Sequence, residues 1–121
     1  TPRNFGTWML LGAAAVKDGD GVEADRGFRQ AIRLKPQSAE AYAGLGLALL
    51  LQQDTARAQQ AADSALRLDP NSKMAQAVRT ACRQVAEIEA TSRQLQDQLK
   101  QAAKNAERAA AAPTPAPSPL D

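Results

Sequence analysis

Residues Ala39–Ser72 read AEAYAGLGLALLLQQDTARAQQAADSALRLDPNS, and they align without a gap with Phe5–Ser38, which read FGTWMLLGAAAVKDGDGVEADRGFRQAIRLKPQS. Each stretch is 34 residues long, and Pro2, Pro36 and Pro70 are separated by the same interval. A fixed period of about 20–50 residues is the signature of a repeat protein, in which each unit is one supersecondary element. The chain is therefore built from a repeated unit.

The two stretches agree at positions that set helix packing. The matched pairs are Trp8 and Tyr42, Leu11 and Leu45, Gly12 and Gly46, Ala24 and Ala58, Ala31 and Ala65, and Pro36 and Pro70. This pattern resembles the tetratricopeptide repeat family, whose units carry W-x2-L-G-x2-Y, then Ala, then Ala or Phe, then Pro. The first unit, which includes Phe28, departs from the pattern only at Ala15, and the second departs at Leu49 and Ala62.

The resemblance implies an all-α fold, an α-solenoid of antiparallel helix pairs. Residues 1–4 are expected to end a preceding repeat, residues 5–38 and 39–72 to form two units, and residues 73–111 to form a long helix. Because the first residue is Thr1 and Pro2 stands where a repeat closes, we expect a fragment of a longer array. A targeting segment could then lie upstream, so the compartment, cytoplasmic or bacterial periplasmic, stays open.

Local signals predict where the helices of each unit begin and end. Asn4 and Ser38 are expected to cap helices over residues 5–17 and 39–52. Asp18-Gly19-Asp20-Gly21 and Gln53-Asp54 supply the turns, and second helices follow over residues 22–35 and 55–68.

Residues 73–111 contain no Gly or Pro and favour one long helix. Its apolar positions alternate in steps of four and three residues, which is a heptad seam interrupted at one place. The seam positions are Met74, Val78, Ala81, Val85, Ile88, Ser92, Leu95, Leu99, Ala102 and Ala106. We expect the first half of this helix to cap the repeats and the second half, from about Ile88, to project or to find another surface.

The last segment, residues 112–121, has a proline at every second position from Pro113 to Pro119. Such a sequence cannot be helical and cannot bury a core, so a disordered Ala/Pro tail is expected there. A linker role is favoured over a ligand role because the PxxP spacing is absent.

Residues that could carry catalysis or bind a metal are few. The chain has no histidine and one cysteine, Cys82, which excludes a disulfide framework, His-based zinc sites and Ser-His or Cys-His catalysis. Asp18-Gly19-Asp20 resembles the start of a calcium loop, but Val22 follows where an acidic residue is needed, so it is interpreted as a turn. Glu87 and Glu89 point to different helix faces. We therefore expect no enzyme activity, no catalytic residue, no cofactor and no metal.

Charge and hydropathy indicate neither a nucleic-acid partner nor a membrane span. The net charge of +2 comes from 15 basic and 13 acidic residues spread along the chain, without the basic cluster that tracks a phosphate backbone. No apolar run reaches the roughly 18 residues that a membrane span needs. Among membranes, nucleic acids and proteins, the expected partner is a protein or peptide.

In the tetratricopeptide family the first helix of each unit lines a concave groove, and most residues at those positions are apolar here. The resemblance assigns the groove to Met9, Ala13, Val16, Lys17, Glu40, Ala43, Leu47, Leu50 and Leu51. The basic clamp with which some family members hold acidic chaperone tails is missing. The groove is suited to an apolar peptide or an amphipathic helix, although the chain's own long helix or a second copy could also cover this strip.

Three hypotheses of function follow. The leading one is a non-catalytic scaffold that binds a protein partner in the groove. The first alternative is self-association, a weak homodimer through the long helix with Val85, Ile88, Leu95 and Leu99 at the contact. The second alternative is an accessory domain of a larger enzyme or of a bacterial envelope assembly protein, because one repeat fold serves many functions.

Overall fold

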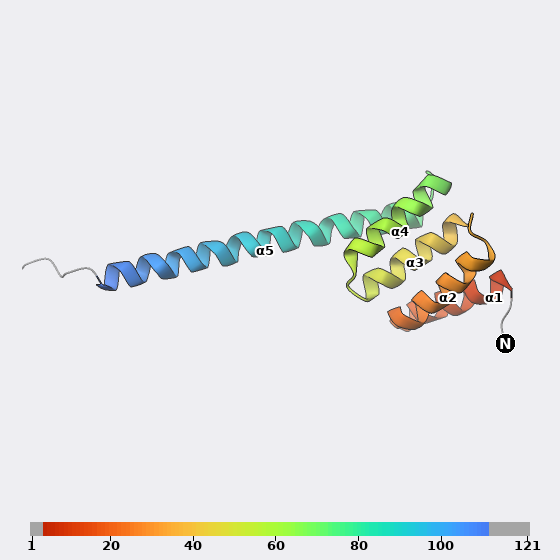
Figure 1. The fold of residues 1–121 in the computed structure, drawn as a ribbon, viewed down its shortest axis with the longest axis horizontal. Helices are drawn as coiled ribbons and strands as arrows, with labels where there is room; N and C mark the ends of the chain where they lie inside the picture. The colour runs from red at the N-terminus through yellow and green to blue at the C-terminus, as the bar shows by residue number, and fades with distance from the viewer. Residues whose placement is uncertain (1–3, 112–121) are drawn as a thin grey trace, which may run out of the picture. The chain divides into compact units, whose positions relative to one another are not determined.

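The computed structural model describes residues 4–111, and within that range the chain is helical and contains no strand (Figure 1). Five helices follow one another: α1 (Phe5–Lys17), α2 (Gly21–Leu34), α3 (Ala39–Leu51), α4 (Thr55–Leu68) and α5 (Lys73–Ala111). The predicted all-α class is confirmed, with helix boundaries within one residue of those expected. The expectations for residues 1–3 and for the Ala/Pro tail lie outside the described residues.

The caps of the first helices recur with the period of the sequence. Asn4 Oδ1 accepts a hydrogen bond from the Thr7 N–H at 2.7 Å, and Ser38 Oγ accepts one from the Ala41 N–H at 3.2 Å. Each cap satisfies an N–H group that has no partner inside the helix. The two predicted caps are therefore confirmed, and helix starts are set locally.

The second helix of each unit begins directly after an aspartate cap. α4 begins at Thr55, as predicted, whereas α2 begins one residue earlier than predicted. Asp20 and Asp54 cap α2 and α4, and their carboxylates accept hydrogen bonds from the N–H groups of Glu23 and Arg57. α2 therefore begins at Gly21 and not at residue 22. An acidic cap also complements the positive end of the helix dipole.

The turns that end α1 and α3 share one backbone conformation. Gly19 has φ +74° and Gln53, at the equivalent place in the second unit, has φ +62°. Glycine reaches this left-handed region at no steric cost, whereas a residue with a Cβ does not. The same turn is thus strain-free in one unit and strained in the other.

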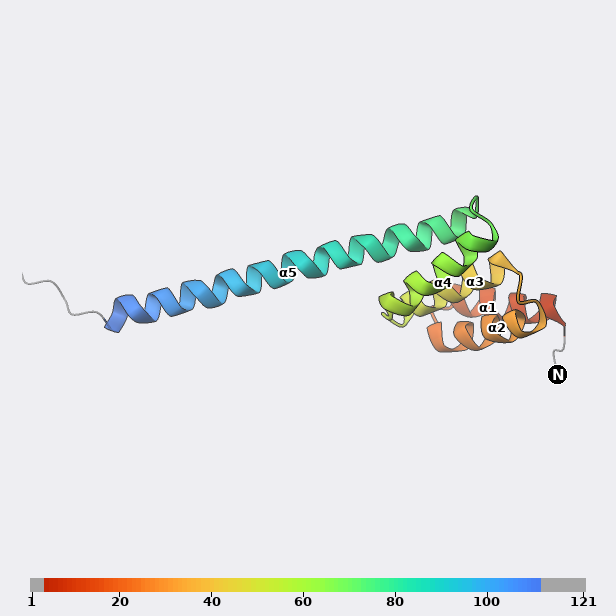
Figure 2. The ribbon, with the colours of Figure 1, turned by 45° about the horizontal axis from the view of Figure 1, so that its top comes forward.

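Neighbouring helices pack as pairs. α1 packs against α2, α3 packs against α4, and α2 and α3 join the pairs, with a further contact between α1 and α3 (Figures 1 and 2). The result is a helical-repeat-like arrangement in which each first helix touches the next.

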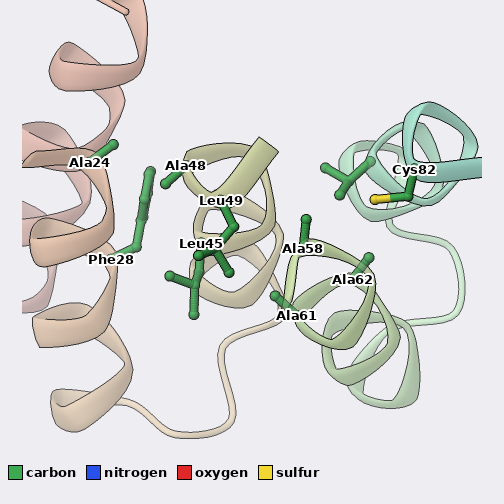
Figure 3. Close-up of a cluster of buried hydrophobic side chains, with 10 residues drawn as sticks. Ala24, Phe28, Leu45, Ala48, Leu49, Ala58, Ala61, Ala62 and Cys82 are labelled. Atoms are coloured by element: carbon green, nitrogen blue, oxygen red, sulfur yellow. The ribbon is translucent and has the colours of Figure 1, made fainter. Parts of the chain in front are cut away.

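Small residues occupy most of the buried positions and allow close helix approach. The repeat pattern predicts that Gly12 faces Ala24 and that Gly46 faces Ala58, and both alanines are fully buried. Gly12, however, faces the ring of Phe28, because a Cβ built on Gly12 would lie 2.8 Å from Phe28 Cζ. Figure 3 shows the Phe28 ring between α2 and α3.

The beginning of α5 belongs to the same core. Ala75, Val78 and Cys82 are buried, and Val78 and Cys82 join the cluster that contains Phe28 and the α4 alanines. Figure 3 shows Cys82 beside the α4 alanines. An ion pair of 3.9 Å between Arg79 and Asp63 adds a polar link between α5 and α4.

The chain divides into two compact units at Glu87, inside the sequence of α5. The residues up to Ala86 form the first unit, with α1 to α4 and the core described above. In the second unit, every described residue, 87–111, is solvent-exposed and helical. The division falls beside Ile88, where the sequence predicts a change in the role of the helix.

Candidate functional site

An apolar cavity of about 600 Å3 opens in the first compact unit, the part of the chain up to Ala86 that contains both repeats. It is bounded by α1, by α3 and by the segment that leads from α4 into α5, with one α2 side chain beneath. Its lining, called the groove below, consists of Met9, Ala13, Val16, Phe28, Glu40, Ala43, Gly44, Leu47, Asp69, Asn71, Ser72, Lys73 and Met74. This volume falls within the usual range of ligand pockets, about 300–1,000 Å3.

The floor of the groove is the aromatic ring of Phe28, which is only 4% exposed. The ring fits because Gly44 lies over it, and a Cβ at Gly44 would stand 2.6 Å from Phe28 Cζ. α2 approaches α1 closely as well, since a Cβ at Gly27 would lie 2.9 Å from the Gly12 nitrogen. Glycines on three helices therefore hold one large side chain under the groove.

The walls are aliphatic and flexible. Met9, Val16 and Leu47 are half-buried and pack against the core cluster with part of their surface. Met74, on the opposite wall, is 50% exposed. The groove thus contains both methionines of the chain, and unbranched thioether side chains adapt their shape to apolar partners.

The rim is polar and carries both signs of charge. Glu40, Asp69 and Lys73 are exposed there. The Asn71 N–H donates to Asp69 Oδ1 at 3.0 Å, which fixes the turn before α5. Among the described residues, neither Glu40 nor Lys73 forms an ion pair. These two side chains are free to contact a polar group on a bound partner.

Six of the nine residues that the resemblance assigns to the groove do line it. They are Met9, Ala13, Val16, Glu40, Ala43 and Leu47. Three others lie outside the lining. Lys17 is exposed at the end of α1, Leu50 packs against the core cluster, and Leu51 stands beside Gly21, where an added Cβ would lie 2.9 Å from Leu51 Cβ.

The far wall of the groove is not among the residues predicted from the sequence. Residues 69, 71 and 72 form the turn after α4, and Lys73 and Met74 begin α5. Position 74 lies one period after Glu40, a predicted groove position, so the repeat pattern could have identified Met74 if it had been continued into α5. The heptad pattern assigns Met74 to the seam and predicts no role for it in the groove.

A second, smaller depression of about 270 Å3 lies on the α1–α2 pair. Trp8, Leu11, Asp20 and Arg26 are among its lining residues, and Trp8 is half-buried. Its lining mixes apolar and charged side chains, so it lacks the continuous aliphatic wall of the groove.

Cys82 offers no reactive thiol. It is buried, and burial raises the pKa of the Cys82 thiol, with the negative charge of Asp63 raising it further. Because the thiolate is the nucleophilic form, a raised pKa makes this side chain inert at neutral pH. Within residues 4–111, no group of three His, Cys, Asp or Glu side chains is placed to hold a metal ion.

The four residues assigned to self-association divide between the two units. Val85, in the first unit, is half-buried. In the second unit Ile88, Leu95 and Leu99 are 66%, 54% and 70% exposed. This is a high exposure for large aliphatic side chains that recur on one helix face.

No family model matches the chain, and no curated protein is detectably similar to it. None of the helices in the described part of the chain has the length and apolar character needed to cross a membrane.

Proposed function

We propose that this chain is a protein-interaction module of tetratricopeptide type that binds an apolar peptide or an amphipathic helix in the groove. The observation that supports this proposal most directly is the groove itself, with its aromatic floor, aliphatic walls and polar rim. Such a lining recognises a partner by apolar contact and orients it by a few charges. No catalysis is assigned to the module.

The repeat geometry supports a tetratricopeptide α-solenoid. Each helix pair matches one 34-residue unit of the sequence. α1 and α3 also contact each other, as expected when the first helices of successive units stack side by side. Stacked first helices form a continuous concave surface in repeat proteins, and both of these helices line the groove.

The chemistry of the lining supports a helical or extended apolar ligand over an acidic tail. Lys73 is the one basic side chain in the lining, whereas Glu40 and Asp69 are acidic. An acidic tail would meet like charges at the rim, which costs binding energy. A ligand with two or three aliphatic anchors and a flanking basic residue satisfies both the walls and the rim.

The test uses exposed groove positions, so that the core stays intact. Peptides are selected from a displayed library of amphipathic helices, and their affinity is measured by calorimetry. We expect Ala13→Glu with Met74→Glu to weaken binding at least tenfold, because two carboxylates would enter an apolar wall.

The matched control places the same charges on exposed apolar positions outside the groove. Leu10 and Val22 are 73% and 67% exposed and are absent from the groove lining. Leu10→Glu with Val22→Glu should leave the affinity unchanged. Equal binding by both double variants, each with native helix content by circular dichroism, would reject the groove as the binding site.

Self-association is the second candidate function, and the exposed aliphatic side chains of residues 87–111 favour it. These residues belong to the second unit and none of them lines the groove. The two functions can therefore be tested separately.

A further inference from the structure

Residues 87–111 form a helical segment with little internal support. Each of these residues is exposed, and no ion pair forms among them. The side-chain hydrogen bonds within the segment are Thr91 to the Glu87 carbonyl at 2.9 Å and Gln101 to Asn105 at 3.4 Å. A helix that lacks tertiary packing gains stability mainly by covering its apolar face with a partner.

The apolar face is defined by spacing. Ile88, Leu95 and Leu99 follow one another at intervals of seven and four residues, and Ala102 and Ala106 continue the same face. Such intervals bring side chains onto one stripe of a helix. The stripe, called the seam below, also includes Ser92 between Ile88 and Leu95, and its two alanines lie at the other end from its large residues.

Charge along the segment is polarised. Residues 87–99 contain three acidic residues and one basic residue, which gives a net charge of −2. Residues 100–111 contain three basic residues and one acidic residue, which gives a net charge of +2. The members are Glu87, Glu89, Arg93 and Asp97 in the first part and Lys100, Lys104, Glu107 and Arg108 in the second.

We propose that residues 87–111 pair with the same segment of a second copy of the chain in antiparallel orientation. In the register that places Leu95 against Leu99 of the second copy, Ile88 meets Ala106 and Ser92 meets Ala102. Each seam layer then combines positions a and d, which is the layer composition of an antiparallel pair. The acidic beginning of each segment lies beside the basic end of the other.

A parallel pair has neither mixed a and d layers nor an acidic half beside a basic half. It would place Ser92, Ala102 and Ala106 each against its own counterpart, which gives three layers of small residues, whereas the antiparallel register has two, both Ser92 against Ala102. It would also bring the two acidic beginnings together and the two basic ends together. Glu89 is the one charged residue of the segment at a position that flanks the seam, so this repulsion acts between the net charges of the segment halves. The opposite net charges of the two halves therefore favour the antiparallel orientation, and the resulting contact is self-complementary, as a two-fold symmetric dimer requires.

The first experiment measures the mass of the full chain by sedimentation equilibrium over a hundredfold range of protein concentration, because dimerisation follows mass action. We expect the average mass to rise from monomer toward dimer. Leu95→Gln with Leu99→Gln should weaken the association at least tenfold while preserving helix propensity. The control Gln94→Ala with Gln101→Ala, off the seam, should dimerise like the parent chain.

The result of this experiment shows whether a second copy of the chain or a different helix covers the seam. A parent chain that stays monomeric at every concentration would overturn the proposal, and the seam would then be left for a different helix. A dimer that the Leu95 and Leu99 substitutions do not weaken would also overturn it, since another surface would carry the contact. Neither result bears on the groove, which has its own variants.

The second experiment determines orientation by disulfide trapping in a Cys82→Ala background, which removes the native thiol. In the proposed register Gln96 lies beside Gln96 of the second copy, whereas in a parallel pair these residues lie on opposite sides of the seam. Gln96→Cys should therefore cross-link readily under mild oxidation, and Ser92→Cys should not. Preferential cross-linking of Ser92→Cys would overturn the antiparallel orientation.

Discussion

Each of the two repeat units has a space beside the glycine of its first helix, and the side chains that fill these two equivalent spaces come from different helices. In the first unit, the space beside Gly12 is occupied by Phe28, which comes from the second helix of that unit. In the second unit, the equivalent residue of Phe28 is Ala62, and the space beside Gly46 is occupied by Val78 from α5. A Cβ built on Gly46 would lie 3.1 Å from Val78 Cγ1. The first unit fills the space beside its glycine with its own side chain, whereas the second depends on a side chain of the helix that follows it.

This difference shows how a repeat core can vary while its backbone plan stays fixed. Large and small residues are exchanged between helices. The large Phe28 of the first repeat lies beneath Gly44, whereas the small Ala62 of the second repeat lies near the larger Val78. Volume-conserving exchanges of this kind are tolerated best in cores. The large residue in the first unit also becomes the floor of the groove, so core packing and site formation coincide there.

The largest loss of stability is expected when a repeat unit loses the side chain that fills the space beside its glycine, Gly12 or Gly46. Phe28→Ala should lower the free energy of unfolding by about 3–5 kcal/mol, and Val78→Ala by about 2 kcal/mol, because the aromatic ring leaves the larger cavity. Urea unfolding monitored by circular dichroism measures both. If Val78→Ala were the more damaging change, the second unit would depend on α5 more than the first depends on its own aromatic ring.

A smaller effect is expected when a methyl group is added to the glycines that face these side chains. Gly44→Ala should destabilise by about 1–3 kcal/mol, because the new Cβ would overlap the buried Phe28 ring. Gly46→Ala should change stability by less than about 1 kcal/mol, since the Val78 methyl needs to move only slightly and alanine favours the helix. Thermal melts of the two variants provide the comparison, and equal losses would contradict it.

The smallest effect concerns the turns at Gly19 and Gln53. Gln53→Gly should stabilise the protein by up to about 1 kcal/mol, because it relieves the left-handed conformation of a residue that carries a Cβ. Gly19→Ala should destabilise it by about as much. The reciprocal pair is measured by chemical denaturation, and two changes of the same sign would show that side-chain contacts dominate at these turns.

Local features of the fold could be predicted from the sequence, because their causes lie within a few residues. The helix starts at Asn4 and Ser38 depend on a side chain that bonds three residues ahead, and such a bond is encoded in the spacing. The start of α2 was placed one residue late because Gly21 was assigned to the turn, whereas Asp20 caps the helix. Helix boundaries that depend on such local hydrogen bonds were therefore predicted to within one residue.

The groove was predictable in part for a different reason. Met9, Ala13 and Leu47 were found because the repeat places equivalent residues of each first helix on one face. Phe28 could not be assigned to the floor, because its ring reaches the groove beneath Gly44 of the next unit, a contact between distant residues that no spacing records. Tertiary packing, and not local propensity, decided that part of the site.

The matched aromatic residues of the two units also equip the chain with separate optical reporters. Trp8 and Tyr42 are the only tryptophan and the only tyrosine in the sequence, and each is half-buried in a different unit. Tryptophan fluorescence thus follows the first unit, and tyrosine absorbance follows the second. The units of repeat proteins can open one after another. The two residues would report such an order of melting for the two helix pairs of this chain without any added label.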